Sequence, residues 1–458
     1  MELCWHRRDL RTVDASVLAG ATTDGSVIPV YVVDPAVEPE LGTRQRAFVG
    51  HTLQALRDRY RALGSDLLVR HGPAADVLEE LVTTHDAETV HYAGAYSPAR
   101  RDQQRRVDER LETTRYVDTV LVDPTVLEAK YPSYSQFYRD WQRVEKPEPR
   151  TEPDATSLAA LEDETPIPFL DHDVSIHLPD AGQVAARDRL DAFCANGIRT
   201  YAATRDDLSN AVEQPTQAVS RLSPALAVGA LGIRTVWRRV VRLYAETDGD
   251  IRRNVEKFGS ELAWREWAYH QLQYHPDLAT TNYKSLPGEI EWRNDEDDLE
   301  AWKRGETGYP LVDAGMRQLE AEGYVHNRPR QVVASFLTKH LLVDWRLGER
   351  HFREQLLDYD PATNPSSWQW IASTGTDSVD VRIFDPVSQL AKYDPEGVFV
   401  RNYVPELAEV PADKLVDWPT LSSDVRNELA PAYPAPIVDR GDAYARAQRV
   451  FERALGKR

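Results

Sequence analysis

The chain has 458 residues, 41% of them hydrophobic, which is enough for two or three globular domains with sizeable cores. No stretch approaches the roughly 18 apolar residues that a membrane span needs, and the start MELCWHRRDLR lacks the apolar core of a signal peptide. The two cysteines, Cys4 and Cys194, are too few for a disulfide framework or a zinc site. We therefore expect a cytoplasmic protein with no membrane anchor and no metal.

The formal net charge of −19 argues against a surface that binds nucleic acid throughout, because phosphates need local positive potential. Acidic residues are spread along the chain, and lysine is scarce beside arginine. This pattern is typical of proteins that stay soluble in concentrated salt, where repulsion between carboxylates is screened. The composition therefore predicts a salt-adapted host.

The first 130 residues alternate strand and helix patterns. Helices are predicted over residues 43–63, 74–84 and 98–113. The predicted strands are the apolar runs Leu3–Trp5, Val27–Val33, Asp66–Val69, Thr89–Tyr92 and Thr119–Val122. Such alternation predicts a mostly parallel, Rossmann-like sheet covered by helices on both faces. Because neither GxGxxG nor a Walker loop is present, we expect no dinucleotide site of the Rossmann type.

The periodicity fades over residues 131–190, where prolines mix with acidic residues, and the run EKPEPRTEPD predicts an extended connector. Residues 191–458 show helical patterns broken by prolines. The sequence thus predicts an α/β domain over 1–130, a connector over 131–190 and an all-α domain over 191–458.

The segment LLDYDPATNPSSWQWIASTGTD contains Asp358, Asp360, Asn364, Trp368 and Trp370. Large aromatic rings beside polar groups suit the binding of a flat, redox-active ring. The alternative is a set of Trp and Asp residues at the ends of buried helices. A calcium loop is disfavoured, because no glycine follows at the turn position and no glutamate closes the loop.

Two further segments combine apolar surface with clustered polar groups. The segment SRLSPALAVGALG, from Ser220, places hydroxyls and a guanidinium before an apolar helix, which suits a phosphate or an ordinary N-cap. The segment FGSELAWREWAYH puts Glu261, Trp264 and Arg265 on one helix face. This arrangement suits recognition of a base by stacking and hydrogen bonding, or a simple Glu–Arg pair on an amphipathic helix.

The segment GYVHNRPRQVVASFLTKHLLVDWR carries polar residues at its start and then becomes strongly apolar. Its polar start, with Asn327, Arg328, Arg330 and Gln331, faces either a cavity or solvent.

Seven segments in a fixed order resemble the photolyase and cryptochrome flavoprotein family. They are WHRRDLR, SRLSP, ELAWRE, GYPLVDAGMRQL, HNRPR, DWRLGER and WQWIASTGTD, and together they span essentially the whole chain. The resemblance implies an α/β antenna domain, a connector and an all-α FAD-binding domain. It is strongest to the enzymes that use light to repair cyclobutane pyrimidine dimers in DNA, and the acidic composition then implies a halophilic archaeon as the source.

By matching motif positions, the resemblance implies a role for each of a set of residues. Asn364 would face N5 of the flavin, Asp360 its pyrimidine edge, and Asp358 would pair with Arg330. The implied FAD-binding residues are Tyr201, Ser220, Arg221, Leu222, Ser223, Arg265, Arg330, Asp358, Asp360 and Asn364. The implied catalytic residues are Glu261, Trp264, Asn327 and Asn364. The implied DNA contacts are Arg205, Trp264, Arg328, Gln331, Trp370 and Arg382, and the implied electron-transfer residues are Trp292, Trp345 and Trp368.

Several departures from the family pattern bear on these implications. Gln331 stands where methionine is usual, which is similar to the DASH branch and leaves open a preference for single-stranded DNA. The segment AYSPARRD lacks the Asn–Glu pair of a folate site, so an antenna of the 8-hydroxy-5-deazaflavin type, or none, is favoured over folate. Only His326 falls where (6-4) photolyases carry paired histidines, so repair of (6-4) photoproducts is not expected.

Three functions remain to be weighed. The leading one is repair of UV-damaged DNA by a monomer, which the residues Glu261, Trp264, Asn327 and Asn364 favour. The second is a cryptochrome-type blue-light receptor that signals to a protein partner. A dark flavin oxidoreductase is disfavoured, because no nicotinamide-binding fingerprint is present.

Overall fold

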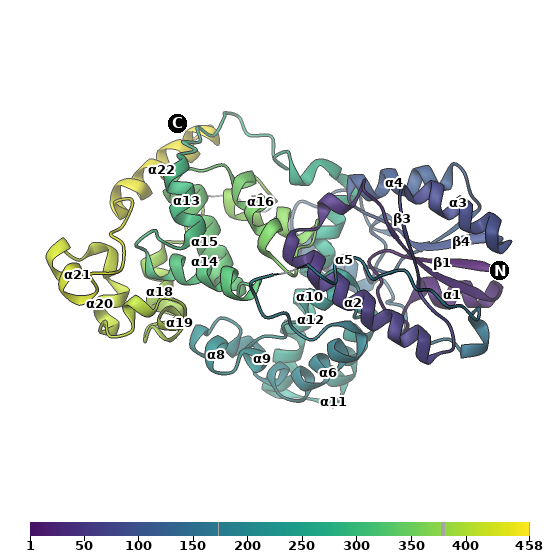
Figure 1. Cartoon of the computed structure of the whole chain (residues 1–458). Coiled ribbons are helices and arrows are strands. Elements are labelled where there is room, and N and C mark those ends of the chain that lie inside the picture. Colours follow the sequence, from purple (N-terminus) through teal and green to yellow (C-terminus); the bar gives the residue numbers. More distant parts are fainter. Residues whose placement is uncertain (173, 377–380, 458) are drawn as a thin grey trace. The chain divides into compact units, whose positions relative to one another are not determined.

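A computed structural model describes residues 1–172, 174–376 and 381–457 of the chain (Figure 1). The chain forms two compact units, each assembled from three segments. Unit 1 comprises Met1–Arg199, Ser220–Asp277 and Leu357–Thr363, and unit 2 comprises Thr200–Val219, Leu278–Leu356 and Asn364–Arg458. No helix of the described residues is long and apolar enough to cross a membrane.

A parallel sheet of five strands, in the order β3-β2-β1-β4-β5, forms the centre of the N-terminal part of unit 1. Consecutive strands are joined by single helices, so the sheet is doubly wound, as predicted. The strands are β1 (Glu2–His6), β2 (Val27–Val33), β3 (Leu68–His71), β4 (Thr89–Ala93) and β5 (Thr113–Tyr116), and the joining helices are α1 (Ser16–Asp24), α2 (Thr43–Ala62), α3 (Ala74–His85) and α4 (Pro98–Asp108).

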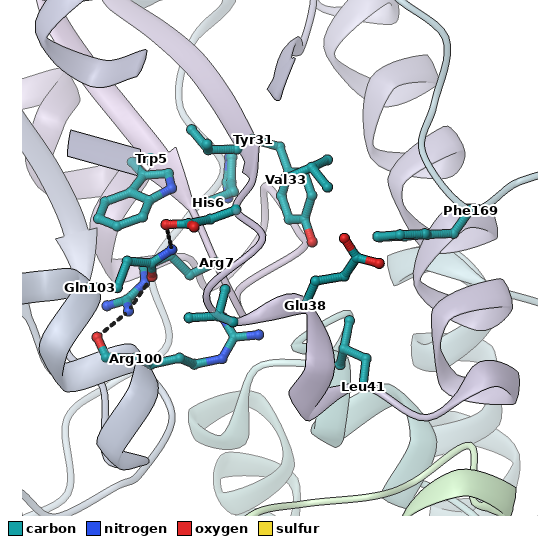
Figure 2. Close-up of a pocket in the computed structure, with 13 residues that line it drawn as sticks. Trp5, His6, Arg7, Tyr31, Val33, Glu38, Leu41, Arg100, Gln103 and Phe169 are labelled. Carbon is teal, nitrogen blue, oxygen red and sulfur yellow. Dashed lines mark hydrogen bonds between the residues drawn. The ribbon is translucent and has the colours of Figure 1, made fainter. Parts of the chain in front are cut away.

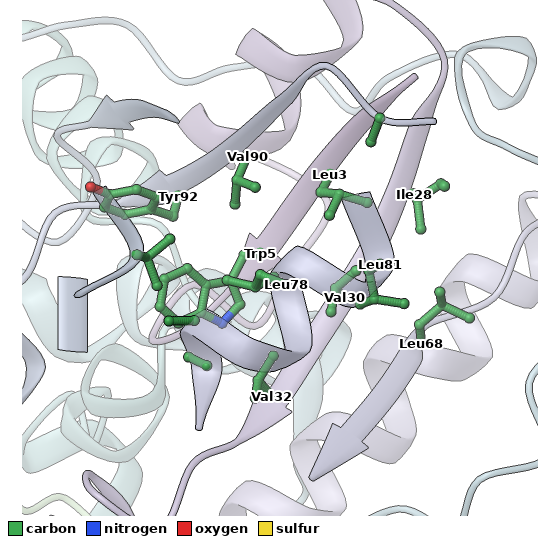
Figure 3. Packing of buried hydrophobic residues seen from close by; sticks show 14 residues of the cluster. Leu3, Trp5, Ile28, Val30, Val32, Leu68, Leu78, Leu81, Val90 and Tyr92 are labelled. Carbon is green, nitrogen blue, oxygen red and sulfur yellow. The ribbon is translucent and has the colours of Figure 1, made fainter. Parts of the chain in front are cut away.

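The two faces of the sheet pack against different helices because strand side chains alternate in direction. On one face, Leu3 and Trp5 of β1 pack with Leu78 and Leu81 of α3 in a buried cluster (Figure 3). On the other face, His6 contacts the hydroxyl of Tyr60 on α2, with 2.6 Å between Nε2 and the oxygen. Both faces are therefore covered, which explains why the β2 sequence, VIPVYVV, is continuously apolar and buried.

The fifth strand lies earlier in the chain than its predicted position at Thr119–Val122. Residues 119–122 form no strand, and β5 is Thr113–Tyr116. The backbone amides of Leu121 and Val122 instead donate to the carboxylate of Glu266, at 2.8 and 3.0 Å. The prediction was wrong because a buried side chain, and no neighbouring strand, satisfies these backbone donors.

The predicted connector also contains a helix, α5 (Tyr134–Arg143), which buries Phe137 and Trp141. The fading periodicity concealed it, because only two of its ten residues are buried. The other helices of unit 1 are α6 (Gly182–Ala195), α10 (Ser223–Val228), α11 (Ile233–Glu246) and α12 (Gly249–Tyr274).

Unit 2 is helical in its described residues, as expected for most of the C-terminal half. Its helices often begin at capping acids, such as Asp295, Asp344, Asp385 and Asp439, each of which accepts a backbone amide of the first turn. The main elements are α13 (Glu296–Arg304), α14 (Pro310–Glu322), α15 (Asn327–Ser335), the π-helix η6 (Phe336–His340), α16 (Trp345–Gln355), α17 (Thr363–Ala372), α18 (Pro386–Tyr393), α19 (Val398–Tyr403), α20 (Ala412–Val416), α21 (Ser423–Leu429) and α22 (Arg440–Ala454), with the short α7 (Tyr201–Thr204), α8 (Leu208–Glu213) and α9 (Pro215–Ala218).

Candidate functional site

Two of the predicted FAD-binding segments meet in unit 1. The hydroxyl of Ser223, at the start of α10, donates to Asp358 Oδ2 at 2.6 Å, although the two residues lie 135 positions apart. Arg221, two residues earlier, has a φ of +50°, in the left-handed region, and Arg189 Nε donates to the Ser220 carbonyl at 3.0 Å. The serines and the arginine of the SRLS segment are therefore held beside the Asp358–Asp360 segment.

The carboxylate of Asp360 accepts four hydrogen bonds from other parts of the chain. Arg8 Nη2 donates to its Oδ2 at 2.8 Å, the hydroxyl of Tyr269 donates to the same oxygen, and the amides of Ala362 and Thr363 donate to Oδ1 at 3.0 and 2.9 Å. Burial alone would raise the pKa of Asp360, but the guanidinium groups of Arg8 and Arg265 lower it to about 2. Asp360 is therefore ionised at neutral pH and can act only as an acceptor.

Arg8 and Tyr269 were not among the predicted site residues. Arg8 lies in the WHRRDLR segment just after β1, and its Nε also donates to the carbonyl of Ala227 at 2.9 Å. Arg265 lies over the ring of Tyr269, 4.7 Å from its centroid, and donates to the carbonyl of Thr119 at 2.8 Å. A motif containing two adjacent arginines was visible in the sequence, but nothing local indicated which carboxylate they would meet.

A second group in unit 1 contains the predicted dimer contacts Glu261 and Trp264. Glu261 pairs with Lys257 one turn earlier on α12, with 2.7 Å between Oε1 and Nζ. Trp264 is 37% exposed. Its ring stacks on Tyr134 of α5, with 3.5 Å between centroids and 8° between planes. Sequence reasoning missed Tyr134, because it lies in the segment that was expected to be an extended connector.

Unit 1 also has an open hollow at the carboxyl ends of β1 and β2 (Figure 2). Trp5, His6 and Tyr31 come from the strands, and Arg100 and Gln103 come from α4. Arg7 donates to Gln103 Oε1 at 2.9 Å and to the carbonyl of Arg100 at 2.8 Å. Ligands of doubly wound sheets commonly bind at this edge.

In unit 2, Asn364 is buried near the start of α17. Its Nδ2 donates to Glu349 Oε1 at 3.2 Å, and Arg353 donates to the other oxygen of Glu349 at 3.0 Å. Because Glu349 accepts from Nδ2, the amide is oriented with its oxygen available to another donor. Glu349 was not predicted, although it lies in the DWRLGER segment.

The three predicted electron-transfer tryptophans all lie in unit 2. Trp368 and Trp345 are almost fully buried, whereas Trp292 is partly exposed and lies edge-on to Phe451, with 5.9 Å between centroids. The indole of Trp345 donates to Asn282 at 3.0 Å. Trp368 also contacts a fourth tryptophan, Trp302, with 6.1 Å between centroids. That neighbour is 66 residues away in the chain and was not predicted.

The predicted DNA contacts of unit 2 form two groups. In the first, Arg328 donates to Asp206 at 2.8 Å and to Gln331 at 2.6 Å, and Arg205 lies 3.8 Å from Asp206. Asn327 is exposed in the first turn of α15, beside this group. In the second, the guanidinium of Arg382 lies 4.9 Å from the ring centroid of Trp370.

The predicted FAD-binding residues are divided between the units. Ser220, Arg221, Leu222, Ser223, Arg265, Asp358 and Asp360 belong to unit 1, whereas Tyr201, Arg330 and Asn364 belong to unit 2. The pairing of Asp358 with Arg330 therefore stays a prediction. Arg330 donates to the carbonyl of Val325 at 2.7 Å. The last residue of the WQWIASTGTD segment, Asp377, lies outside the described residues.

The doubly wound sheet and the helical part match two protein-family models. Residues 2–156 match a model described as DNA photolyase, and residues 258–453 match a model described as the FAD binding domain of DNA photolyase. The fold and these matches define a flavoprotein with an α/β domain and a helical FAD-binding domain.

Three similar proteins indicate which kind of flavoprotein this is. A deoxyribodipyrimidine photo-lyase from Halobacterium salinarum is 43% identical, with all of both chains covered. A bacterial class III photolyase from Agrobacterium tumefaciens is 34% identical, with a TM-score of 0.88 and coverage of 100% of this chain and 98% of the other. An archaeal photolyase from Sulfolobus tokodaii, solved with two FAD molecules, is 30% identical, with a TM-score of 0.84 and coverage of 99% and 100%. The chain belongs to the DNA photolyase family.

Proposed function

We propose that this protein binds FAD and uses blue light to repair cyclobutane pyrimidine dimers in DNA. The observation that carries the proposal is the cluster in which Ser223 meets Asp358 while Asp360 stays ionised beside it. The full-length similarity to the deoxyribodipyrimidine photo-lyase of Halobacterium salinarum supports the substrate class. The retention of Glu261, Trp264, Asn327 and Asn364 favours repair over a purely signalling role.

The residues of unit 1 suit the two chemically different parts of FAD. A left-handed turn at Arg221 beside the Ser220 hydroxyl offers donors to phosphates, whereas the Ser223 hydroxyl donates to Asp358. The carboxylate of Asp360 would face a flavin pyrimidine edge, and Arg8 and Tyr269 fix its direction. In unit 2, the Asn364 amide, oriented by Glu349, would present its oxygen to a flavin N–H. The charge pair between Asp358 and Arg330 would hold the two segments around the ring.

Once bound, reduced FAD supplies the photoexcited electron that splits the cyclobutane ring and regains it afterwards, so that no net oxidation occurs. Trp264 would stack on the flipped-out dimer, Glu261 would hydrogen-bond it and stabilise its radical anion, and Asn327 would orient it. Arg205, Arg328 and Arg382, with Gln331 and Trp370, would contact the flanking strand, because phosphate contacts position DNA without reading its sequence. The indoles of Trp292, Trp345 and Trp368 would provide an oxidisable series that supplies electrons to the site.

We further propose that the hollow beside β1 and β2 holds a second chromophore of the 8-hydroxy-5-deazaflavin type. Its lining combines aromatic rings with arginine, glutamine and carboxylate groups, which suits a flat polar ring system (Figure 2). Residues 1–130 would then be the antenna domain, 131–190 the connector and 191–458 the catalytic domain of a monomeric, cytoplasmic enzyme.

The test is illumination of the reduced, FAD-loaded protein with oligothymidylate that carries cyclobutane dimers. We expect blue light to restore the thymine absorbance near 260 nm, and Glu261→Ala to lower the repair yield at least about tenfold while FAD stays bound. The matched control is Glu256→Ala, because Glu256 is an exposed glutamate on the same helix.

A flavin that is bound and photoreduced while no thymine reappears would contradict the repair function and favour the receptor. Repair of single-stranded but not duplex substrate would instead identify the DASH-like preference that Gln331 left open.

A further inference from the structure

The ring of Trp264 is covered on one side by the ring of Tyr134. The 3.5 Å between their centroids and the 8° between their planes mean that the two rings overlap almost completely. Tyr138, one turn later on α5, continues the stack, with 5.6 Å between its centroid and that of Tyr134 and 15° between planes. The stack belongs wholly to unit 1.

The position of Tyr134 is fixed by contacts of α5 with α12. Its hydroxyl donates to the carbonyl of Ser260 at 3.0 Å, on the helix that carries Trp264. Phe137 packs on Trp267 with 4.9 Å between centroids, and the indole of Trp141 donates to Glu266 at 3.4 Å. These contacts anchor the helix at successive turns, so the ring of Tyr134 has little freedom to leave Trp264.

Tyr134 also lies close to the other predicted dimer contact. Burial raises the pKa of Tyr134, and the negative charge of Glu261 raises it further. Tyr134 is therefore a neutral phenol within electrostatic range of Glu261. Because the Tyr134 ring is neutral, it adds no charge beside the Glu261 carboxylate where the substrate would bind.

One face of Trp264 is thus occupied, yet the residue remains 37% exposed. A solvent-exposed tryptophan ordinarily samples several rotamers, and a ligand that stacks on it must immobilise it. A ring held against a fixed neighbour has already lost that freedom, so its open face is presented in a single orientation.

We infer that Tyr134 is a positioning residue for substrate binding, which holds Trp264 so that one face of the indole is ready to stack on the pyrimidine dimer. This inference rests on the proposed function. Base–aromatic stacking is sensitive to ring orientation, and Tyr134 determines that orientation from a helix outside the predicted catalytic segments.

The test is dark binding of the FAD-loaded protein to a thymine oligonucleotide with and without one cyclobutane dimer. We expect Tyr134→Leu to weaken binding of the damaged oligonucleotide about tenfold, with little change for the undamaged one. Tyr134→Phe should stay within about twofold of the parent, because it keeps the ring and loses only the bond to Ser260. Tyr244→Leu is the matched control, since Tyr244 is 42% exposed and lies on α11 of the same unit.

A double-mutant cycle separates positioning from a general structural effect. If Tyr134 acts through Trp264, then adding Tyr134→Leu to Trp264→Leu should cost no further affinity. An equal loss in both backgrounds would overturn the inference, and so would full affinity in Tyr134→Leu when Trp264→Leu binds weakly. If Trp264→Leu itself bound damaged DNA normally, that result would also contradict the proposed role of Trp264 in the dimer site. Bound FAD is measured in every variant, and Tyr134→Met replaces Tyr134→Leu if the latter loses it.

Discussion

At the scale of single residues, the guanidinium of Arg8 stabilises the ionised form of Asp360 more than any other group does. Arg8 pairs with Asp360 at 2.8 Å, and the Arg8 and Asp360 side chains are only 17% and 6% exposed. Removing one member of a buried charge pair leaves the other without compensation. We expect Arg8→Met to lower the free energy of unfolding by about 3 kcal/mol, measured by urea denaturation. Arg105→Met is the control, because its ion pairs are exposed and its loss should not measurably change stability.

The Arg8–Asp360 pair also predicts how the free energy of unfolding changes with pH. The pKa of Asp360 is lowered to about 2 in the folded protein, against about 3.9 in an unfolded chain. A lowered carboxyl pKa stabilises the fold above the unfolded value and loses that contribution as pH falls toward the folded value. The difference in unfolding free energy between the parent and Arg8→Met should therefore shrink between about pH 4 and pH 2. A difference that stayed constant with pH would show that Asp360 is not the group that Arg8 stabilises.

At the scale of elements, a glutamate of α12 holds the segment between β5 and α5 in place through hydrogen bonds. Glu266 accepts from the amides of Leu121 and Val122 and from the indole of Trp141, and burial raises its pKa. We expect Glu266→Ala to lower the free energy of unfolding by about 3 kcal/mol, because it leaves these donors unsatisfied. Glu266→Gln keeps one acceptor oxygen and should cost about half as much. A Glu266→Gln variant as stable as the parent, beside a large loss in Glu266→Ala, would mean that packing, and not hydrogen bonding, sets the effect.

A close approach of two backbones fixes the end of α10. Gly229 has a φ of +77°, and a Cβ at this position would lie 1.9 Å from the carbonyl oxygen of Arg8. We expect Gly229→Ala to lower the free energy of unfolding by about 3 kcal/mol, because it combines backbone strain with a clash against backbone atoms.

The matched control for this substitution is Gly249→Ala. Gly249 has a φ of +52° with open space around it, so only strain of about 1 kcal/mol should appear. If the two variants were equally stable in urea denaturation, the contact between α10 and the Arg8 backbone would not limit stability.

At the scale of the whole molecule, added salt should have opposite effects on folding and on DNA binding in a chain with a net charge of −19. Raising KCl from 0.1 M to 1 M shortens the Debye length from about 10 Å to about 3 Å and screens repulsion between carboxylates. We expect the thermal midpoint to rise by several degrees over this range, measured by circular dichroism. The 43% identity to a protein of Halobacterium salinarum, a halophilic archaeon, agrees with the expected salt adaptation.

DNA affinity should fall over the same range of salt, because binding releases counterions from the phosphates. Sucrose at equal osmolality is the control for the affinity measurement, since it screens no charge. A midpoint that did not change with KCl would contradict the expected salt adaptation.

The family, strands β1 to β4, helices α2 to α4 and the residue types at the site could be predicted without the structure. These features are local: an apolar period, a capping acid or a motif such as SRLSP is complete within a few turns of chain. The predicted doubly wound sheet and helical C-terminal half were confirmed for this reason.

Which of these residues contact one another depends on the folding of distant segments onto each other. Arg8 and Asp360 are 352 positions apart, and Tyr134 covers a tryptophan 130 positions later. The position of β5 also depends on a distant contact, because the carboxylate of Glu266 accepts the amide hydrogens of Leu121 and Val122. Such contacts depend on the packing of distant segments, which no local periodicity encodes, so the partners of the site residues became visible only in the folded chain.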